Sequence, residues 1–196
     1  MSSDEIERIV NTGLEKLGMT IQPDARHRIT VLSQGLPHYT HLIGLYAARE
    51  SLDRRSLEIT DEMVGRAIEK AISGAQESIT NAWHQAIRSP RKDNLFADVL
   101  LACALAEKDQ QGTFAAQDVR PPIRAITGKP YSIASFAQHL NEFCEAGRGP
   151  MLERSGTKRK YRFRFLNPLM QPYAIMQGFR TNKITKALLN GIGLPG

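Results

Sequence analysis

The sequence is poor in cysteine and has no long apolar run. Its two cysteines, Cys103 and Cys144, lie within apolar helical patterns and lack a CxxC spacing, so we expect buried thiols in a reducing cytosol. No uncharged run approaches the ~18–20 residues of a membrane-spanning helix, and the first residues are acidic, whereas a signal peptide begins with basic ones. These absences predict a cytoplasmic protein without a membrane partner.

The sequence also lacks a catalytic arrangement. It contains neither a GxxxxGKS/T phosphate-binding loop nor an Asp-rich strand for magnesium, so it has no machinery for nucleotide hydrolysis. His38 and His41 lie three residues apart, but spacing places no third metal ligand beside them. His139 and Cys144 lie five residues apart on one expected helix and therefore point in different directions, unlike a base and its nucleophile. We expect a chain that is not an enzyme and that holds no metal ion or cofactor by itself.

Positive charge is concentrated in the second half of the chain. Residues 1–90 contain ten Lys/Arg and twelve Asp/Glu, while residues 91–196 contain sixteen and eight, so the two parts carry −2 and +8 of the total of +6. This distribution favours an anionic partner, with nucleic acid first and an acidic protein or lipid second. A well-solvated surface is the alternative.

The first half predicts a bundle of helices. Apolar residues recur at helical spacing over four segments, residues 3–17, 24–32, 36–52 and 60–72. Pro37 fits the first turn of the third helix, where its missing N–H costs nothing. Residues 79–89 continue helically, and Ser89-Pro90 predicts a domain boundary.

The second half predicts helices followed by a β-hairpin. The expected elements are a core helix (94–108), a short strand (112–114), a helix kinked or split by Pro121-Pro122 (115–126), a further helix (131–145), a hairpin (151–165) and a closing helix (169–179). This is the order of a winged helix-turn-helix. The fold class is therefore mainly α, with a helical bundle over residues 1–89 and a winged helix-turn-helix domain over residues 90–180. Residues 181–196 would form a C-terminal tail with a possible short helix over 184–189.

Periodicity predicts the faces of the helix over residues 131–145 and of the hairpin that follows it. The helix places Ile133, Phe136, Leu140 and Phe143 on one buried face. In the hairpin, Tyr161, Phe163 and Phe165 would face the core, whereas Lys160, Arg162 and Arg164 would face solvent. Residues 148–164 contain seven Lys/Arg and one acid, a local charge of +6 that equals the charge of the whole chain.

The turn of the hairpin determines its register. A four-residue loop over residues 155–158, which we favour, would place Leu152 opposite Tyr161 and Glu153 opposite Lys160. A two-residue turn at Ser155-Gly156 would instead place Leu152 against Arg159.

A winged helix can bind DNA through its hairpin and the helix that precedes the hairpin, here residues 131–145. The candidate groove-facing residues are Ser132, Ser135, Gln138 and His139. The candidate phosphate contacts are Arg154, Lys158, Arg159, Lys160, Arg162 and Arg164. The helix has no Lys or Arg and ends in Glu142 and Glu145, so it is a poor reader of bases. The alternative is that the hairpin docks on a protein partner.

Three stretches carry a resemblance to a known family. They are Leu32-Ser33-Gln34-Gly35-Leu36-Pro37-His38-Tyr39, Leu100-Leu101-Ala102-Cys103-Ala104-Leu105-Ala106, and Tyr161-Arg162-Phe163-Arg164-Phe165 followed by Asn167-Pro168-Leu169-Met170. With the order of elements, they resemble the C-terminal half of bacterial AAA+ and STAND ATPases, including replication-initiator-type members. The likeness covers nearly the whole chain and makes residues 1–89 similar to the helical lid of these ATPases.

The resemblance implies a role in ATP binding that is shared with a missing part. In these families an ATP-binding core precedes the lid and the Gly-x-Pro turn lies against adenine, which implies nucleotide contacts for Gly35, Leu36, Pro37 and His38. An Arg often follows this Pro and reaches the terminal phosphate; here the position is His38, whose neutral imidazole supplies no fixed charge. The chain would thus be a fragment, its first partner the missing N-terminal ATPase core, and ATP the cofactor of the full-length parent. The alternative is a self-contained winged-helix transcriptional regulator, which predicts a dimer and a palindromic site.

Overall fold

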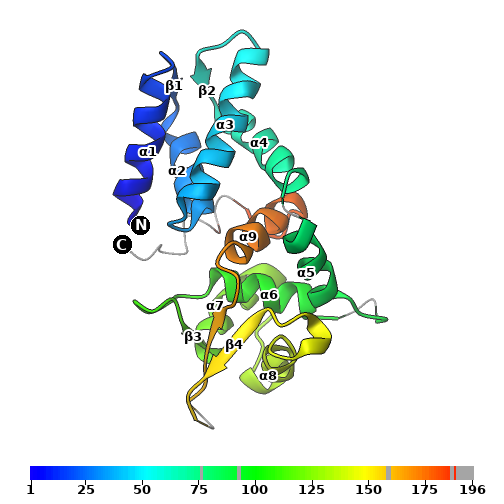
Figure 1. Cartoon of the computed structure of the whole chain (residues 1–196). Coiled ribbons are helices and arrows are strands. Elements are labelled where there is room, and N and C mark those ends of the chain that lie inside the picture. Colours follow the sequence, from blue (N-terminus) through cyan, green and yellow to red (C-terminus); the bar gives the residue numbers. More distant parts are fainter. Residues whose placement is uncertain (76, 92–93, 158–159, 186–187, 189–196) are drawn as a thin grey trace. The chain divides into compact units, whose positions relative to one another are not determined.

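The computed structural model describes residues 1–75, 77–91, 94–157, 160–185 and 188. These residues form two compact units, which divide between Ala75 and Glu77. Both units are mainly helical, and Figure 1 labels their elements. In this part of the chain, no helix has the length and apolar character needed to cross a lipid bilayer.

The first unit contains four helices and two very short strands. In chain order, these are α1 (Ser3–Glu15), β1 (Thr20–Ile21), α2 (Pro23–Ser33), α3 (Pro37–Asp53), β2 (Glu58–Ile59) and α4 (Asp61–Ser73). β1 and β2 pair in parallel, with Ile21 opposite Ile59. The four expected helices are all present, and each begins and ends within a few residues of its predicted bounds.

Capping residues explain where two helices of this unit, α1 and α4, begin. The Ser2 hydroxyl accepts the Glu5 N–H while the Glu5 carboxylate accepts the Ser2 N–H, a reciprocal cap at the start of α1. Thr60 caps α4 by accepting the N–H of Met63. The helices bury one common core, which includes Ile6, Ile29, Leu32, Tyr39, Ile43, Val64 and Ile68.

The second unit surrounds one largely buried helix. Its elements are α5 (Glu77–Ile87), α6 (Phe96–Leu105), β3 (Phe114–Ala115), the 3₁₀ helix η1 (Ala116–Val119), α7 (Arg120–Thr127), α8 (Ile133–Glu142), the 3₁₀ turn η2 (Ala146–Arg148), β4 (Leu152–Ser155), β5 (Arg162–Phe165) and α9 (Met170–Arg180). All residues of α6 except Ala97 and Asp98 are buried, and α5, α7, α8 and α9 all pack on this helix. The expected core helix is therefore confirmed.

Pro121 and Pro122 split the helix that follows β3. η1 ends at Val119 and α7 begins at Arg120, so both prolines lie in the first turn of α7, where no backbone N–H is needed. The predicted interruption is confirmed. The first turn of α8 departs from its expected pattern, because Ile133 is 38% exposed whereas Phe136, Leu140 and Phe143 are buried.

A three-stranded antiparallel sheet has the order β3-β5-β4. Leu152 lies opposite Phe165 and Glu153 lies opposite Arg164, and the last pair before the turn is Ser155 with Arg162. Both predicted registers of this hairpin were therefore wrong. Phe163 and Phe165 are buried as expected, but Tyr161 precedes the strand and is only half-buried.

The limits of the second unit also differ from the expected domain bounds. The predicted boundary at Ser89-Pro90 follows α5, whereas α5 belongs to the second unit, where Ile79, Trp83 and Ala86 are buried and the helix packs on α6 and α9. At the other end, Ile184 is buried and Lys183 forms an ion pair with Asp98 of α6, so the ordered unit continues past residue 180. Most of the expected short helix over 184–189 lies outside the described residues.

Candidate nucleic-acid interface

The end of α8 is joined directly to the sheet. The Phe143 carbonyl accepts hydrogen bonds from the N–H groups of Met151 and Leu152, which fixes the start of β4 against the helix. Phe136, Leu140 and Phe143 anchor α8 in the core of the second unit. The helix and the hairpin β4–β5 therefore form one rigid support, on which exposed side chains can keep fixed positions.

The exposed face of α8 carries small polar side chains. Ser132, Ser135 and Gln138 are exposed, as the sequence predicted. The Ser132 and Ser135 hydroxyls lie 2.9 Å apart, and the Gln138 amide donates to the Glu142 carboxylate at 2.9 Å. These groups offer donors and acceptors without a formal positive charge.

His139 does not join this face. Its ring packs edge-on against Phe96 with the centroids 4.6 Å apart, and its Nδ1 is buried without a hydrogen-bond partner among the described residues. Burial lowers the pKa of His139, although the nearby Glu142 opposes this shift. Because the ring packs on Phe96 and its Nδ1 is buried, the assignment of His139 to a groove-facing position is corrected.

Arg154 connects the hairpin to the exposed face of α8. Its Nη1 donates to the Asn141 Oδ1 at 2.8 Å, and its guanidinium lies 4.7 Å from the centroid of the Tyr161 ring. The ring and the amide orient this cation without neutralising it. Arg154 is consequently a charged donor held in place beside the helix, which is the arrangement that a phosphate contact needs.

Two other cations of the hairpin form ion pairs. Arg162 pairs with Asp109 at 2.8 Å, and it donates to the hydroxyl and the carbonyl of Thr113 at 2.6 and 2.9 Å. Arg164 pairs with Glu153, its cross-strand neighbour, at 2.6 Å. The two carboxylates weaken the positive electrostatic potential of Arg162 and Arg164. Arg162 also connects β5 to the turn that precedes β3.

Asp109 organises that turn. Its carboxylate accepts the Thr113 hydroxyl at 2.6 Å, the Thr113 N–H at 2.8 Å and the Gln111 N–H at 3.0 Å. These hydrogen bonds, that of the Thr113 hydroxyl above all, hold the pKa of Asp109 below its usual value, and Arg162 adds to the effect.

One described cation near the tip of the hairpin keeps its charge without an acidic partner. Lys160 is exposed and has no ion pair among the described residues. Lys158 and Arg159, also predicted as phosphate contacts, lie outside the part of the chain that the structure describes. Gly156, with φ of +85°, supplies the left-handed backbone with which the chain leaves β4.

Arg148 has a structural role that composition did not reveal. Its guanidinium donates to the carbonyls of Ala86 and Arg88 and to the Glu142 carboxylate, and it lies 3.4 Å from the centroid of the Phe96 ring. The side chain thereby ties the end of α5 to α8. One of the seven cations counted in the basic segment is therefore mostly buried and paired.

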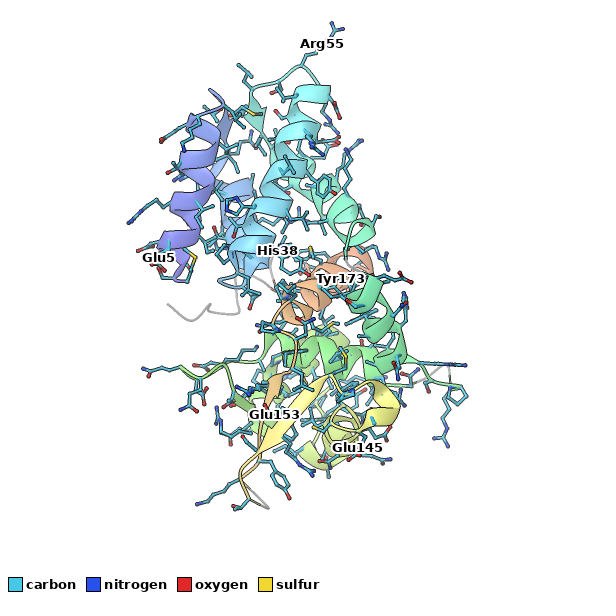
Figure 2. The ribbon with its side chains drawn as sticks, in the orientation of Figure 1. Glu5, His38, Arg55, Glu145, Glu153 and Tyr173 are labelled. Atoms are coloured by element: carbon cyan, nitrogen blue, oxygen red, sulfur yellow. The ribbon has the colours of Figure 1, made fainter. Side chains whose placement is uncertain are left out.

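The second candidate site lies in the first unit, at the start of α3. Gln34 and Gly35 have positive φ angles of 47° and 72°, so the chain reverses sharply before Leu36, the N-cap, and Pro37, the first helical residue. His38 is exposed on the first turn (Figure 2), with its ring edge-on to Tyr39. The four residues are therefore contiguous at one helix N-terminus.

Neither unit contains a cluster suited to a metal ion. Within the described ranges, no group of three or more His, Cys, Asp or Glu side chains is arranged to hold one. Cys103 is fully buried and Cys144 is half-buried, and burial raises the pKa of both thiols.

No model of a known protein family matches the chain, and neither a curated protein nor a solved structure does so.

Proposed function

We propose that the second unit is a winged helix that binds duplex DNA through α8 and the hairpin β4–β5. The order α6, β3, α7, α8, β4, β5 supports this reading, because it is the order of a winged helix-turn-helix. The observation that carries the proposal is the position of Arg154, whose cation is held beside the exposed face of α8 by Asn141 and Tyr161.

In this proposal the hairpin supplies affinity and α8 supplies little sequence selectivity. Arg154, Lys160 and the neighbouring Lys158 and Arg159 would contact phosphates, whereas Arg162 and Arg164 retain their acidic partners. Ser132, Ser135 and Gln138 would meet the edges of bases or sugars. They cannot form the bidentate Arg–guanine contact that is common in specific complexes.

We propose further that the first unit is the lid of an AAA+ or STAND-type ATPase. The lid would close over ATP held by an ATPase core elsewhere in the parent protein and would change how the winged helix meets its partner. The sharp turn at Gln34 and Gly35 supports this proposal, because it precedes a first turn of α3 on which His38 is exposed, and a helix N-terminus attracts phosphate. Without that core, the chain would not hydrolyse ATP.

A salt series of duplex binding by fluorescence anisotropy tests the DNA proposal. Four phosphate contacts should give a slope of log K against log salt of about −3.6, at about −0.9 per contact. The test variant replaces four hairpin cations with Gln: Arg154 and Lys160, which have no ion pair among the described residues, and the adjacent Lys158 and Arg159. It leaves Arg162 intact because that side chain clamps Asp109 and Thr113.

A charge-matched control separates local contacts from net charge. It replaces four exposed cations of the first unit with Gln, at Arg8, Lys16, Arg49 and Arg55. The hairpin variant should lose most of the slope and the control should keep it. Equal losses in both variants, or no salt-dependent binding by the wild type, would refute duplex binding through the hairpin.

Two alternatives make different predictions in the same samples. A self-contained winged-helix regulator predicts a stable dimer in light scattering and a palindromic site, whereas the lid proposal predicts a monomer. Docking of the hairpin on a protein is favoured by the neutralisation of Arg162 and Arg164, and it predicts that the wild type does not bind DNA.

A further inference from the structure

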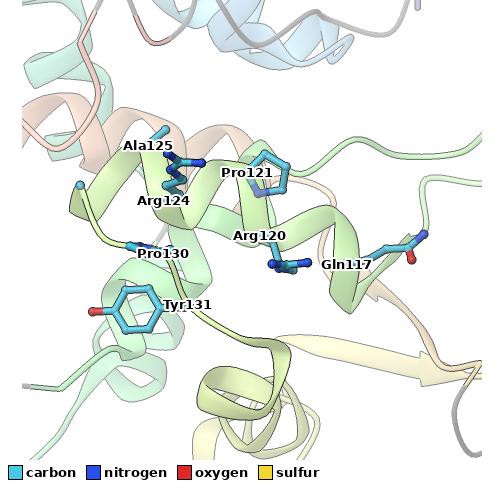
Figure 3. Close-up of a pocket in the computed structure, with 8 residues that line it drawn as sticks. Gln117, Arg120, Pro121, Arg124, Ala125, Pro130 and Tyr131 are labelled. Atoms are coloured by element: carbon cyan, nitrogen blue, oxygen red, sulfur yellow. The ribbon is translucent and has the colours of Figure 1, made fainter.

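An open hollow lies on the surface of the second unit, along α7. It has a volume of about 590 Å³, which is within the range of roughly 300–1,000 Å³ usual for ligand sites. Figure 3 shows its lining, which comes from η1, α7 and the turn that leads to α8. Two arginines, a tyrosine and two prolines contribute to the lining, and none of its residues is acidic.

Arg120 and Arg124 give the hollow its positive charge. They lie four residues apart on α7, a spacing that places their side chains next to each other on one helix face. Both are exposed, and neither guanidinium has an ion pair within the described ranges of the chain. Like charges at this spacing destabilise a helix, and an anion bound between them would remove that repulsion. A phosphate group fits this role because guanidinium groups bind it with paired hydrogen bonds.

Apart from the two arginines and Gln117, the lining is apolar and partly aromatic. The Tyr131 ring lies at one end of the hollow, with Pro130 next to it and Pro121 on the helix (Figure 3). A flat apolar surface of this kind suits the face of a nucleobase, and stacking on aromatic side chains is how proteins hold unpaired strands. A duplex keeps its bases stacked inside and presents mainly phosphates to a convex surface, so it would leave this lining unused.

We infer that the α7 hollow binds single-stranded nucleic acid, with a phosphate between Arg120 and Arg124 and a base on Tyr131. This inference deepens the proposed function by adding an unpaired segment to the nucleic acid that the protein recognises. It does not depend on the hairpin, since all the groups involved lie between Gln117 and Tyr131.

Binding of a fluorescent 12-nucleotide oligo-dT to the full chain tests the inference directly. One phosphate held by the two arginines should give a salt slope of about −0.7, the value expected per phosphate contact on a single strand. The double variant Arg120→Gln/Arg124→Gln should bind at least about tenfold more weakly, because charge-assisted bonds to phosphate are lost. Tyr131→Ala should also weaken binding, whereas Tyr131→Phe, which keeps the ring, should not.

The control variant Arg91→Gln/Arg180→Gln removes two exposed cations of the same unit from outside the hollow. It should bind the oligonucleotide like the wild type. The hairpin variant described above should also retain this binding, so failure of duplex binding and failure of the hollow would be distinguishable. Absence of oligo-dT binding would overturn the inference, as would binding that is lost in the hairpin variant but kept in Arg120→Gln/Arg124→Gln.

A second arm uses a blunt duplex and the same duplex with a single-stranded tail. The wild type should prefer the tailed substrate, and Arg120→Gln/Arg124→Gln should lose that preference while its affinity for the blunt duplex stays unchanged. Equal affinities of the wild type for both substrates would show that the hollow does not take an unpaired strand.

Discussion

Replacing Arg148 should weaken the second unit more than replacing any other cation of the basic segment. Arg148→Gln removes a hydrogen bond to the carbonyl of the buried Ala86, a partly buried ion pair with Glu142 and a guanidinium stacked on Phe96. Each loss costs about 1 kcal/mol, which is the usual net contribution of one such contact. The free energy of unfolding should therefore fall by about 3 kcal/mol.

The sole tryptophan makes the measurement specific to this unit. Trp83 is buried on α5, with its ring 6.1 Å from that of Tyr173, so its fluorescence in a urea titration reports unfolding of the second unit. With a urea m-value of ~1.5 kcal/mol/M, a loss of 3 kcal/mol lowers the midpoint by about 2 M. Arg148→Lys keeps the charge but not the planar fork, so its midpoint should lie between those of Arg148→Gln and the wild type.

Arg154→Gln is the matched control, since it removes a charge from the same region at an exposed site. Its cost should be below about 1 kcal/mol, as is usual for exposed contacts. If Arg148→Gln shifted the midpoint no further than Arg154→Gln does, the proposed tie between α5 and α8 would be refuted.

Three further predictions concern an acid, the two thiols and a glycine. The pKa of Asp109 is held below its usual 3.8, so the stability that its carboxylate contributes is present above pH 3.8 and is lost as the pH falls through the lowered pKa. The difference in unfolding midpoint between the wild type and Asp109→Asn should therefore vanish in acid. A difference that stays constant with pH would contradict this. Native protein at pH 8 should react slowly with a thiol reagent, Cys144 before the fully buried Cys103, and immediate reaction of both would show that the core is open. Gly156→Ala should lower the free energy of unfolding by about 1–2 kcal/mol, because φ is +85° there and a Cβ would lie 2.5 Å from the backbone carbonyl oxygen of Lys160. Gly147→Ala is the control, since a Cβ there meets nothing within 4 Å, and it should be nearly neutral in the same urea titration. Equal effects of the two substitutions would contradict a strained turn at Gly156.

The hairpin shows how far periodicity can predict this fold. The alternation of Phe163 and Phe165 with Arg162 and Arg164 predicted the correct faces. The expected register differed from the observed one by four residues, an even shift that leaves every side chain on the same face. The hydrophobic pattern alone therefore could not distinguish the expected register from the observed one. The segment between the paired strands is longer than the turn residues indicated.

The candidate site was predictable in its location but not in its electrostatics. Composition identified the basic hairpin and the polar face of α8. It could not show that Arg162 pairs with Asp109, or that Arg148 is held by Ala86, because these partners are far away in the sequence. Arg120 and Arg124 could have been noticed as an unpaired i, i+4 couple, but their hollow depends on the turn before α8.

The order of strands in the sheet has a consequence for synthesis on the ribosome. β5 pairs with β3 on one side and β4 on the other, yet it is the last of the three strands to emerge. Phe114 of β3 therefore remains without its partner Phe163 until about fifty further residues have been made, and α6 also waits for α9. The first unit, complete at residue 75, can fold while the ribosome is still adding the second. The nascent second unit, by contrast, exposes its most apolar helix until α9 has been made, and this is the stage at which a chaperone would be of most use.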